Sequence, residues 1–425
     1  MKRILKLLLA FVLLFIGLVY WSVSGVDETF GQCQLYEPKT AEGVDFKTYD
    51  SVLVAASTIY DASLVKRFMQ GNNYRDAWAT PTVVPVLYLD TLYGGVTIVK
   101  EGGGHQTHSL KLEDSIGTEY TLRSINKDPT PLIPEIARTL KLENVIVDGI
   151  SAQHPYGAIL TAALADAVDV LHTRPKVVFL PKQPGLTTYN DAFGDRLFLL
   201  EYEPKGPNNW TDLDNVFDIA DTDNLQEHKQ ELGAALTVDK RAVIRARLFD
   251  FLIGDWDRHA KQWGWVVQDL GDRKIARPIA ADRDNAFFSN DGVLPKILSS
   301  RYLVPRLRPY DEDIDFMEGL VYPFDRYFLI DTDMALFTSE AKALQQLLTD
   351  EVIANAFKVW PDQITKLDAE AITKKLKQRR EDLVDYAKAY KEEIDRQGLV
   401  HEPLKGSEDK GFPEALTRCF ECGDQ

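Results

Sequence analysis

Histidine and cysteine are scarce in this chain of 425 residues, which has seven histidines and three cysteines. The histidines are scattered, so the sequence offers no His-rich set of metal ligands. Cys419 and Cys422 form a single C-x-x-C pair, and a zinc site normally needs four ligands. In an exported protein a disulfide is the better interpretation, and Cys33 is a possible partner for one of the two.

The sequence also lacks a dense run of lysine and arginine, and its formal net charge is −16. Such a surface repels phosphate backbones, so we expect no nucleic-acid partner. Internal repeats and low-complexity tracts are absent as well. The hydrophobic fraction of 45% is high enough for a substantial core, which argues against a disordered chain.

Long hydrophobic runs are missing except at the N-terminus, where residues 7–21 are apolar and follow Lys2, Arg3 and Lys6. This pattern is typical of a secretory signal or a short membrane anchor. Tyr20 and Trp21 at the end of the run favour an anchor, because aromatic side chains prefer the membrane interface. We therefore expect either an inner-membrane anchor with an extracytoplasmic body or a protein secreted to the periplasm.

The order of the expected elements indicates an α+β protein. The part from 94 to 128 is predicted to form three strands, with Gly102, Gly103 and Gly104 in the first turn. Residues 206–240 are acidic and rich in turn formers, and residues 335–397 are expected to be mostly helical. Strands are predicted at 51–57, 80–89, 96–100, 108–113, 119–126, 176–181, 196–204, 263–267 and 274–281, and helices at 62–69, 133–142, 156–170 and 239–254.

Two acidic segments carry the chemistry: IGDWDRH (253–259) at the end of a helix, and AADRDNAF (280–287) after a hairpin. Crowded carboxylates repel one another unless they hold a cation or share a proton. Phosphoryl transfer needs one carboxylate to orient a nucleophile and others to hold a divalent cation on the phosphates. An all-oxygen ligand set suits Mg²⁺ or Mn²⁺ better than zinc.

These segments resemble the atypical kinase superfamily that includes the HipA toxin kinase, the Fam20-type secretory kinases and the phosphoinositide kinases. Asp257-Arg258-His259 matches its catalytic D-x-H, and Asp284-Asn285-Ala286 matches its metal-binding segment. Residues 55–400 also resemble an uncharacterised bacterial family, frequent in Bacteroidetes, in which this domain often follows a calcineurin-like phosphoesterase. The matching segments are NYRDAWATP (73–81), GGGHQTHSLKL (102–112), YTLRSINKDP (120–129), HPYGA (154–158) and RLFDFLIGDWDRH (247–259).

The resemblance implies a two-lobed, protein-kinase-like fold with a small β-rich N-lobe and a larger, mostly helical C-lobe. It divides the chain into a signal or anchor (1–25), a linker (26–50), an N-lobe with the glycine-rich hairpin (51–205), a C-lobe with the catalytic and metal-binding loops (206–400) and a C-terminal tail (401–425). ATP would be the phosphoryl donor, and the acceptor an unidentified hydroxyl.

The resemblance also implies roles for single residues. Asp257 would orient the acceptor hydroxyl, with His259 as a catalytic residue or a loop cap. Asp284 would hold the metal, and Asp282 would either assist it or be the metal ligand in its place. The position of the usual metal-binding Asn holds Gln262, which puts metal occupancy in doubt. The remaining assignments are Gly102, Gly103 and Gly104 over the phosphates, Arg123 or Lys127 as the phosphate cation, Glu135 as its acidic partner, and Glu201 or Tyr202 near the adenine.

Plainer interpretations stand beside these. Asp255 is expected to be structural, and Trp256, Trp263 and Trp265 are expected to form core and cleft walls. His105 and His108 are not expected to bind metal.

Three functions remain open: an ATP-dependent kinase, an exported pseudokinase that only binds a ligand or partner, and a metal-dependent phosphoesterase. The scarcity of ATP outside the inner membrane, Arg123 and Gln262 favour the second, whereas Asp257 and Asp284 favour the first. The phosphoesterase ranks last because it predicts a His-rich ligand set.

Overall fold

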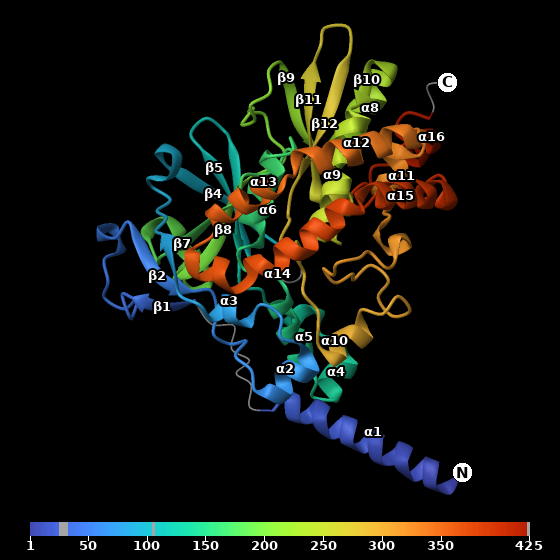
Figure 1. Cartoon of the computed structure of the whole chain (residues 1–425). Helices are drawn as coiled ribbons and strands as arrows, with labels where there is room; N and C mark the ends of the chain where they lie inside the picture. Colours follow the sequence, from blue (N-terminus) through green and yellow to red (C-terminus); the bar gives the residue numbers. More distant parts are fainter. Residues whose placement is uncertain (25–32, 104–106, 423–425) are drawn as a thin grey trace.

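The computed structural model describes residues 1–24, 33–103 and 107–422 (Figure 1). The strands are β1 (Gln34–Glu37), β2 (Ser51–Ala55), β3 (Thr82–Pro85), β4 (Val96–Gly102), β5 (Ser109–Asp114), β6 (Glu119–Ser124), β7 (Lys176–Leu180), β8 (Arg196–Tyr202), β9 (Val216–Asp221), β10 (Leu236–Val238), β11 (Trp263–Asp269) and β12 (Lys274–Ala280). The helices are α1 (Lys2–Ser22), α2 (Leu64–Gln70), α3 (Arg75–Ala79), α4 (Glu135–Thr139), α5 (Glu143–Asp148), α6 (Gly157–Asp166), α7 (Asn190–Phe193), α8 (Thr222–Leu232), α9 (Lys240–Ile253), α10 (Val293–Leu298), α11 (Pro323–Leu329), α12 (Met334–Leu347), α13 (Asp350–Ala356), α14 (Asp362–Glu381), α15 (Leu383–Gln397) and α16 (Glu414–Arg418).

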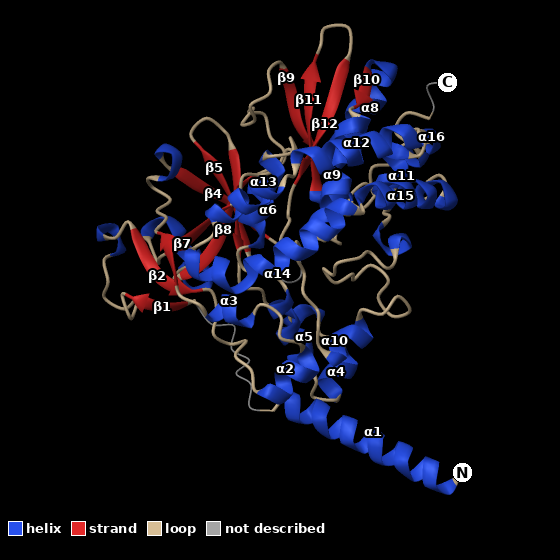
Figure 2. Cartoon of the chain, viewed as in Figure 1, coloured by secondary structure: helices blue, strands red, loops and turns tan. Residues whose placement is uncertain are grey.

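The strands form three sheets (Figure 2). The first half of the chain contributes a three-stranded sheet, β1-β2-β3, and a five-stranded antiparallel sheet in the order β4-β5-β6-β8-β7. A four-stranded sheet, β10-β12-β11-β9, belongs to the second half, and only its β10–β12 pair is parallel. The rest of the second half is mostly helical, so the predicted α+β class with an N-terminal apolar segment is confirmed.

Helix α9 is the central helix of the second half. Asp239 caps its N-terminus by accepting a hydrogen bond from the Ala242 backbone N–H at 3.1 Å. From Val243 onward nearly every side chain is buried, because helices α12, α14 and α15 and strand β12 pack around it. Gly254 ends the helix with a φ of 68°, and a Cβ there would lie 2.5 Å from the Tyr310 ring. The predicted helix 239–254 is therefore confirmed with both of its ends explained.

Several elements differ from the sequence-based expectation. The acidic, turn-rich stretch 206–240 contains β9, α8 and β10, because β9 pairs with β11 and β10 with β12. The third strand ends at Ser124 instead of residue 126. The helix predicted at 133–142 is shorter than expected: α4 covers Glu135–Thr139, and a separate short helix, α5, begins at Glu143 after a break at residues 140–142.

The flanking segments pack against the body. In the predicted linker, residues 34–37 form β1 and Phe46 lies in the core, while residues 25–32 lie outside the described part. In the predicted tail, Phe420 packs against Tyr327 and Phe328.

The structure shows which of the three cysteines form a disulfide. Cys419 and Cys422, the two cysteines of the C-x-x-C pair, form a disulfide with each other. Cys33 is a free thiol whose Sγ donates to the Asp195 carbonyl at 3.4 Å, and burial raises its pKa to about 12. The alternative pairing of Cys33 with one of these two residues is therefore wrong.

Candidate active site

The loop after α9 carries Asp257 and His259. The His259 Nε2 atom lies 3.9 Å from Asp257 Oδ1. Burial raises the pKa of Asp257, and the nearby charge of Asp282 adds to this. Burial, together with the charges of Lys405 and Arg258, lowers the pKa of His259 to about 4, so its imidazole is neutral at pH 7.

The loop after β12 carries Asp282, which lies opposite Arg123. Asp282 has a φ of 54°, a left-handed conformation that Asp tolerates better than most residues. Its Oδ2 atom lies 3.3 Å from Arg123 Nη1, whereas its Oδ1 atom is buried and has no hydrogen-bond partner within the described residues. Burial alone would raise the pKa of Asp282, but Arg123 and Lys127, with a smaller contribution from Gln262, hold it below its usual range.

Asp284, two residues further along, forms an ion pair with Lys127. Burial raises the pKa of Asp284, and Asp282 adds to the effect, whereas the charge of Lys127 opposes it. Lys127 lies three residues beyond the end of β6 and comes from the opposite side of the site. The five-stranded sheet and the loop after β12 are thus joined by two cation–carboxylate contacts.

Glu201 on β8 forms an ion pair with Arg123. Arg123 Nε lies 3.5 Å from Glu201 Oε2, and Thr173 Oγ1 donates to Glu201 Oε1 at 2.7 Å. Burial raises the pKa of Glu201, with Arg123 and Thr173 opposing. Its carboxylate is therefore engaged with Arg123, which sequence reasoning did not foresee. The neighbouring Tyr202 stacks on Trp210 at 4.7 Å between ring centroids.

The glycine turn lies at the same end of the sheet as Arg123. Gly102 is paired with Ser109, and Ser109 with Arg123, so the three share one row across β4, β5 and β6. Two strand spacings separate Gly102 from Arg123, about 10 Å. Gly103 has a φ of 120°, and a Cβ there would lie 2.0 Å from the Thr107 carbonyl oxygen. Gly104 and His105 lie outside the described residues.

Asp250 on α9 holds both loops in place. Its Oδ1 accepts from Arg283 Nη2 at 2.9 Å, and its Oδ2 accepts from Arg247 Nη1 at 2.8 Å and Arg258 Nε at 3.2 Å. Arg258 Nη1 also donates to the Ala281 carbonyl at 2.8 Å, which links the first loop to the second. We call Asp250 with these three arginines the Asp250 cluster. Burial opposes the charge of Asp250, but the arginines keep its pKa below the usual range.

Sequence reasoning missed the Asp250 cluster. A signal was present: Arg247 and Asp250 are the charged residues, three positions apart, in the otherwise apolar stretch 246–253 of α9. Sequence reasoning also missed Lys405, whose charge acts on Asp257 and His259. No local pattern indicates it, because it comes from the C-terminal segment almost 150 residues after Asp257.

Other predicted residues have different surroundings. Glu135 is exposed and forms no ion pair among the described residues, so it is not the partner of Arg123 or Lys127. Trp263 and Trp265 are buried and pack on Phe324, as expected for core residues. Asp255 is buried as well, and its backbone N–H donates to the Asp250 carbonyl, which fits a structural role.

The oxygen atoms of the site bear on whether it can hold a divalent cation. Within the described residues no three His, Cys, Asp or Glu side chains form a cluster suited to a metal ion. Asp282 nonetheless lies beside the Gln262 amide and close to the charge of Asp284, and its buried Oδ1 atom has no hydrogen-bond partner in the described part of the chain. A hard cation fits this oxygen set.

No family model matches the sequence, and no curated protein matches it. Among solved structures, the chain is similar to the proinflammatory kinase CtkA of Helicobacter pylori, at 12% identity and a TM-score of 0.38 over 70% of this chain and 95% of that one. It is also similar to the toxin–antitoxin system structure of Shewanella oneidensis MR-1 that holds HipA, HipB and operator DNA, at 12% identity and a TM-score of 0.33 over 70% of this chain and 67% of that one.

Proposed function

We propose that this protein is an ATP-dependent phosphotransferase of the atypical kinase type that acts on a hydroxyl acceptor. One observation carries the proposal: Asp257, Asp282 and Asp284 from two loops meet Arg123 of β6 and Lys127 of the segment after β6 at one place. Cations and carboxylates brought together in this way match the needs of phosphoryl transfer, which relies on positioning and charge neutralisation.

Each residue then has a distinct role. Asp257, whose raised pKa makes it a stronger base, orients the acceptor hydroxyl and takes its proton. Arg123 and Lys127 bind phosphate oxygens in place of the carboxylates they now contact. Asp282, Asp284 and Gln262 would hold Mg²⁺ or Mn²⁺, which neutralises phosphate charge when bound. Gly102, Gly103 and Gly104 would let the backbone approach the phosphates.

A second candidate, a binding module without transfer, is favoured by a different observation. The cavity lined by Arg123, Lys127 and Asp284 has a volume of about 20 Å³. Ligand pockets generally measure about 300–1,000 Å³, so this cavity is too small for a nucleotide while Arg123 and Lys127 contact the carboxylates. A protein that uses these contacts to stay closed would bind a partner elsewhere and transfer no phosphate.

The membrane anchor and the family of the protein are also part of the proposal. α1 is a 21-residue helix that contains an 18-residue window with a mean hydropathy of 2.5, long and apolar enough to cross a membrane. We propose that it anchors the chain in the inner membrane with the body outside the cytoplasm, and that the body belongs to the Bacteroidetes-type family named above.

Thermal unfolding of the full chain in detergent, with ATP and Mg²⁺ or Mn²⁺, tests the proposal. A saturating ligand at a hundredfold excess over Kd raises stability by about 2.7 kcal/mol. We expect Asp284→Asn to lose the metal-dependent rise. Asp257→Asn should keep the rise and lose phosphate transfer by about 10²–10⁴-fold. Asp350→Asn, at an exposed side chain, is the matched control.

The two candidates give different results. Stabilisation together with phosphate transfer that depends on Asp257 supports the kinase. If the wild type is not stabilised by any nucleotide with either metal, the phosphotransferase is ruled out and the binding module is favoured.

A further inference from the structure

Helix α2 exchanges the usual places of some of its side chains: two large apolar residues are exposed and a lysine is buried, whereas Met69 is buried as in an ordinary surface helix. Leu64 and Phe68, one turn apart, are 87% and 64% exposed. Lys66, on the opposite face, is only 3% exposed. Surface helices normally turn such apolar residues inward and lysine outward. The exchange indicates that the outer face of α2 meets an apolar environment.

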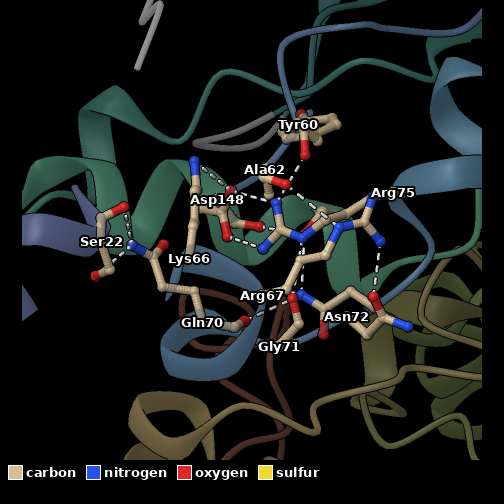
Figure 3. Close-up of polar contacts among 12 residues, drawn as sticks. Ser22, Tyr60, Ala62, Lys66, Arg67, Gln70, Gly71, Asn72, Arg75 and Asp148 are labelled. Atoms are coloured by element: carbon tan, nitrogen blue, oxygen red, sulfur yellow. Dashed lines mark hydrogen bonds and ion pairs between the residues drawn. The ribbon is translucent and has the colours of Figure 1, made fainter. Parts of the chain in front are cut away.

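Polar contacts fix α2 in this orientation (Figure 3). Lys66 Nζ lies 2.9 Å from Asp148 Oδ1, and Arg75 forms a second ion pair with the same carboxylate. Gln70 Nε2 donates to both the carbonyl and the hydroxyl of Ser22, the last residue of α1, at 3.1 Å. Rotation of α2 would break these buried contacts, which is costly. Buried contacts therefore fix the outward orientation of Leu64 and Phe68, and one of them joins α2 to the end of α1.

Two neighbouring elements extend the apolar face. Tyr20 of α1 donates to the Leu140 carbonyl at 3.1 Å, at the end of α4, and the Asn72 backbone N–H after α2 donates to Asp291 at 2.8 Å, just before α10. Ile136 on α4 is 69% exposed, and Tyr302 after α10 is 80% exposed. We call these residues the α2–α4–α10 face: Leu64, Phe68, Ile136, Leu140, Ile297, Leu298, Tyr302, Leu303 and Val304.

The segment of this face around α10 is basic, although the whole chain has a net charge of −16 and the segments around α2 and α4 also carry the exposed acids Asp61 and Glu135. Exposed basic side chains border it at Lys141, Lys296, Arg301 and Arg306. Asp291 is the one acid in residues 290–308, and its carboxylate already accepts from backbone N–H groups. Basic residues beside exposed apolar side chains suit a surface of anionic lipids.

We propose that the α2–α4–α10 face rests in the interface of the membrane that α1 spans, in contact with anionic lipid headgroups. The inference depends on the proposed role of α1 as a membrane span. α1 is about 31 Å long, and it leaves the body beside α2, α4 and α10 (Figure 1). Because a bilayer that surrounds α1 reaches the neighbouring surface, exposed Leu and Phe side chains there lie in lipid instead of water.

Depth-dependent quenching of the full chain in anionic lipid nanodiscs tests the inference. A polarity-sensitive fluorophore is attached at Phe68→Cys or Leu303→Cys, with Leu13→Cys in α1 as the membrane reference. Ile116→Cys, at an exposed turn between β5 and β6, is the control. The native thiol Cys33 is half-buried and its pKa is raised to about 12, so it forms little of the thiolate that would react with the label.

We expect lipid-borne quenchers to quench labels at positions 13, 68 and 303, with blue-shifted emission, and to leave position 116 unchanged. If position 13 is quenched and positions 68 and 303 behave like 116, the lipid contact is wrong while the anchor stands. If position 13 itself is not quenched, the anchor fails and the inference with it. Labels shielded from aqueous quencher but not reached by lipid quencher would indicate a protein occupant, such as a second copy, and overturn the lipid assignment.

Discussion

The Asp250 cluster and the proposed reaction site lie side by side, and both pair carboxylates with cations, yet they differ in how completely the carboxylates are satisfied. Asp250 is fully buried, and both of its oxygens accept from arginine. Asp282 leaves one buried oxygen without a partner, and Asp257 is partly open to solvent. A saturated carboxylate can only support structure, whereas an unsaturated one next to displaceable cations can accept a ligand.

The largest effect that tests this comparison is on stability. Asp250→Asn removes the one negative charge shared by three buried arginines. We expect the free energy of unfolding to fall by about 3–5 kcal/mol, the usual cost of breaking a buried ion pair. Urea unfolding measures it, with Asp350→Asn at an exposed ion pair as control, where the change should stay within about 1 kcal/mol. A loss at Asp250 no larger than that at Asp350 would contradict the structural role.

Asp255 lies between the two regions, and the pH dependence of stability that its raised pKa produces gives a second test of the comparison. Burial raises its pKa to about 8, against the charge of Arg258, with Asp250 adding to the rise. The native state therefore holds a proton that the unfolded state releases above pH 4. This contribution to stability is complete below about pH 4 and is lost as the pH rises toward 8, by at most about 1.4 kcal/mol per pH unit.

Asp255→Asn removes that titration. The difference in stability between wild type and Asp255→Asn should shift with pH in favour of the variant between pH 4 and 8, as measured by urea unfolding at several pH values. A difference that stays constant with pH would show that Asp255 titrates normally in the folded protein.

The smallest effect is expected at Asp282. Asn tolerates the left-handed conformation at this position, and the one ion-pair partner of Asp282 among the described residues, Arg123, keeps its pair with Glu201. We expect Asp282→Asn to change the free energy of unfolding by less than about 1 kcal/mol, since residues placed for function contribute little to stability. The same variant should lose metal-dependent stabilisation. A loss as large as that of Asp250→Asn would place Asp282 with the structural carboxylates.

Much of the fold was predictable because its signals are local. The helix 239–254 announces itself through the Asp239 cap, the apolar positions and Gly254, and the strands of the five-stranded sheet show short apolar runs bounded by turns. Strands β9 and β10 were missed because their pairing partners, β11 and β12, lie more than 35 residues away and the sequence around them is acidic.

The site was predictable only in part. The crowding of Asp257, Asp282 and Asp284 in the sequence pointed to them, but which cation meets which carboxylate did not follow from spacing. Lys127 lies beyond its strand and still reaches Asp284, while Glu201, expected near an adenine, turns toward Arg123. Contacts of this kind depend on how the sheet sits over the loops, which no local pattern specifies.

The short link from Asp284 to α10 has a consequence for encounter rates. Only eight residues separate the two, so the carboxylate lies within about 30 Å of the start of α10. If the α2–α4–α10 face rests on lipid, the reaction site is confined to a thin layer above the bilayer. An acceptor held in the same membrane would then meet it by diffusion in two dimensions, at an effective concentration set by the thickness of that layer.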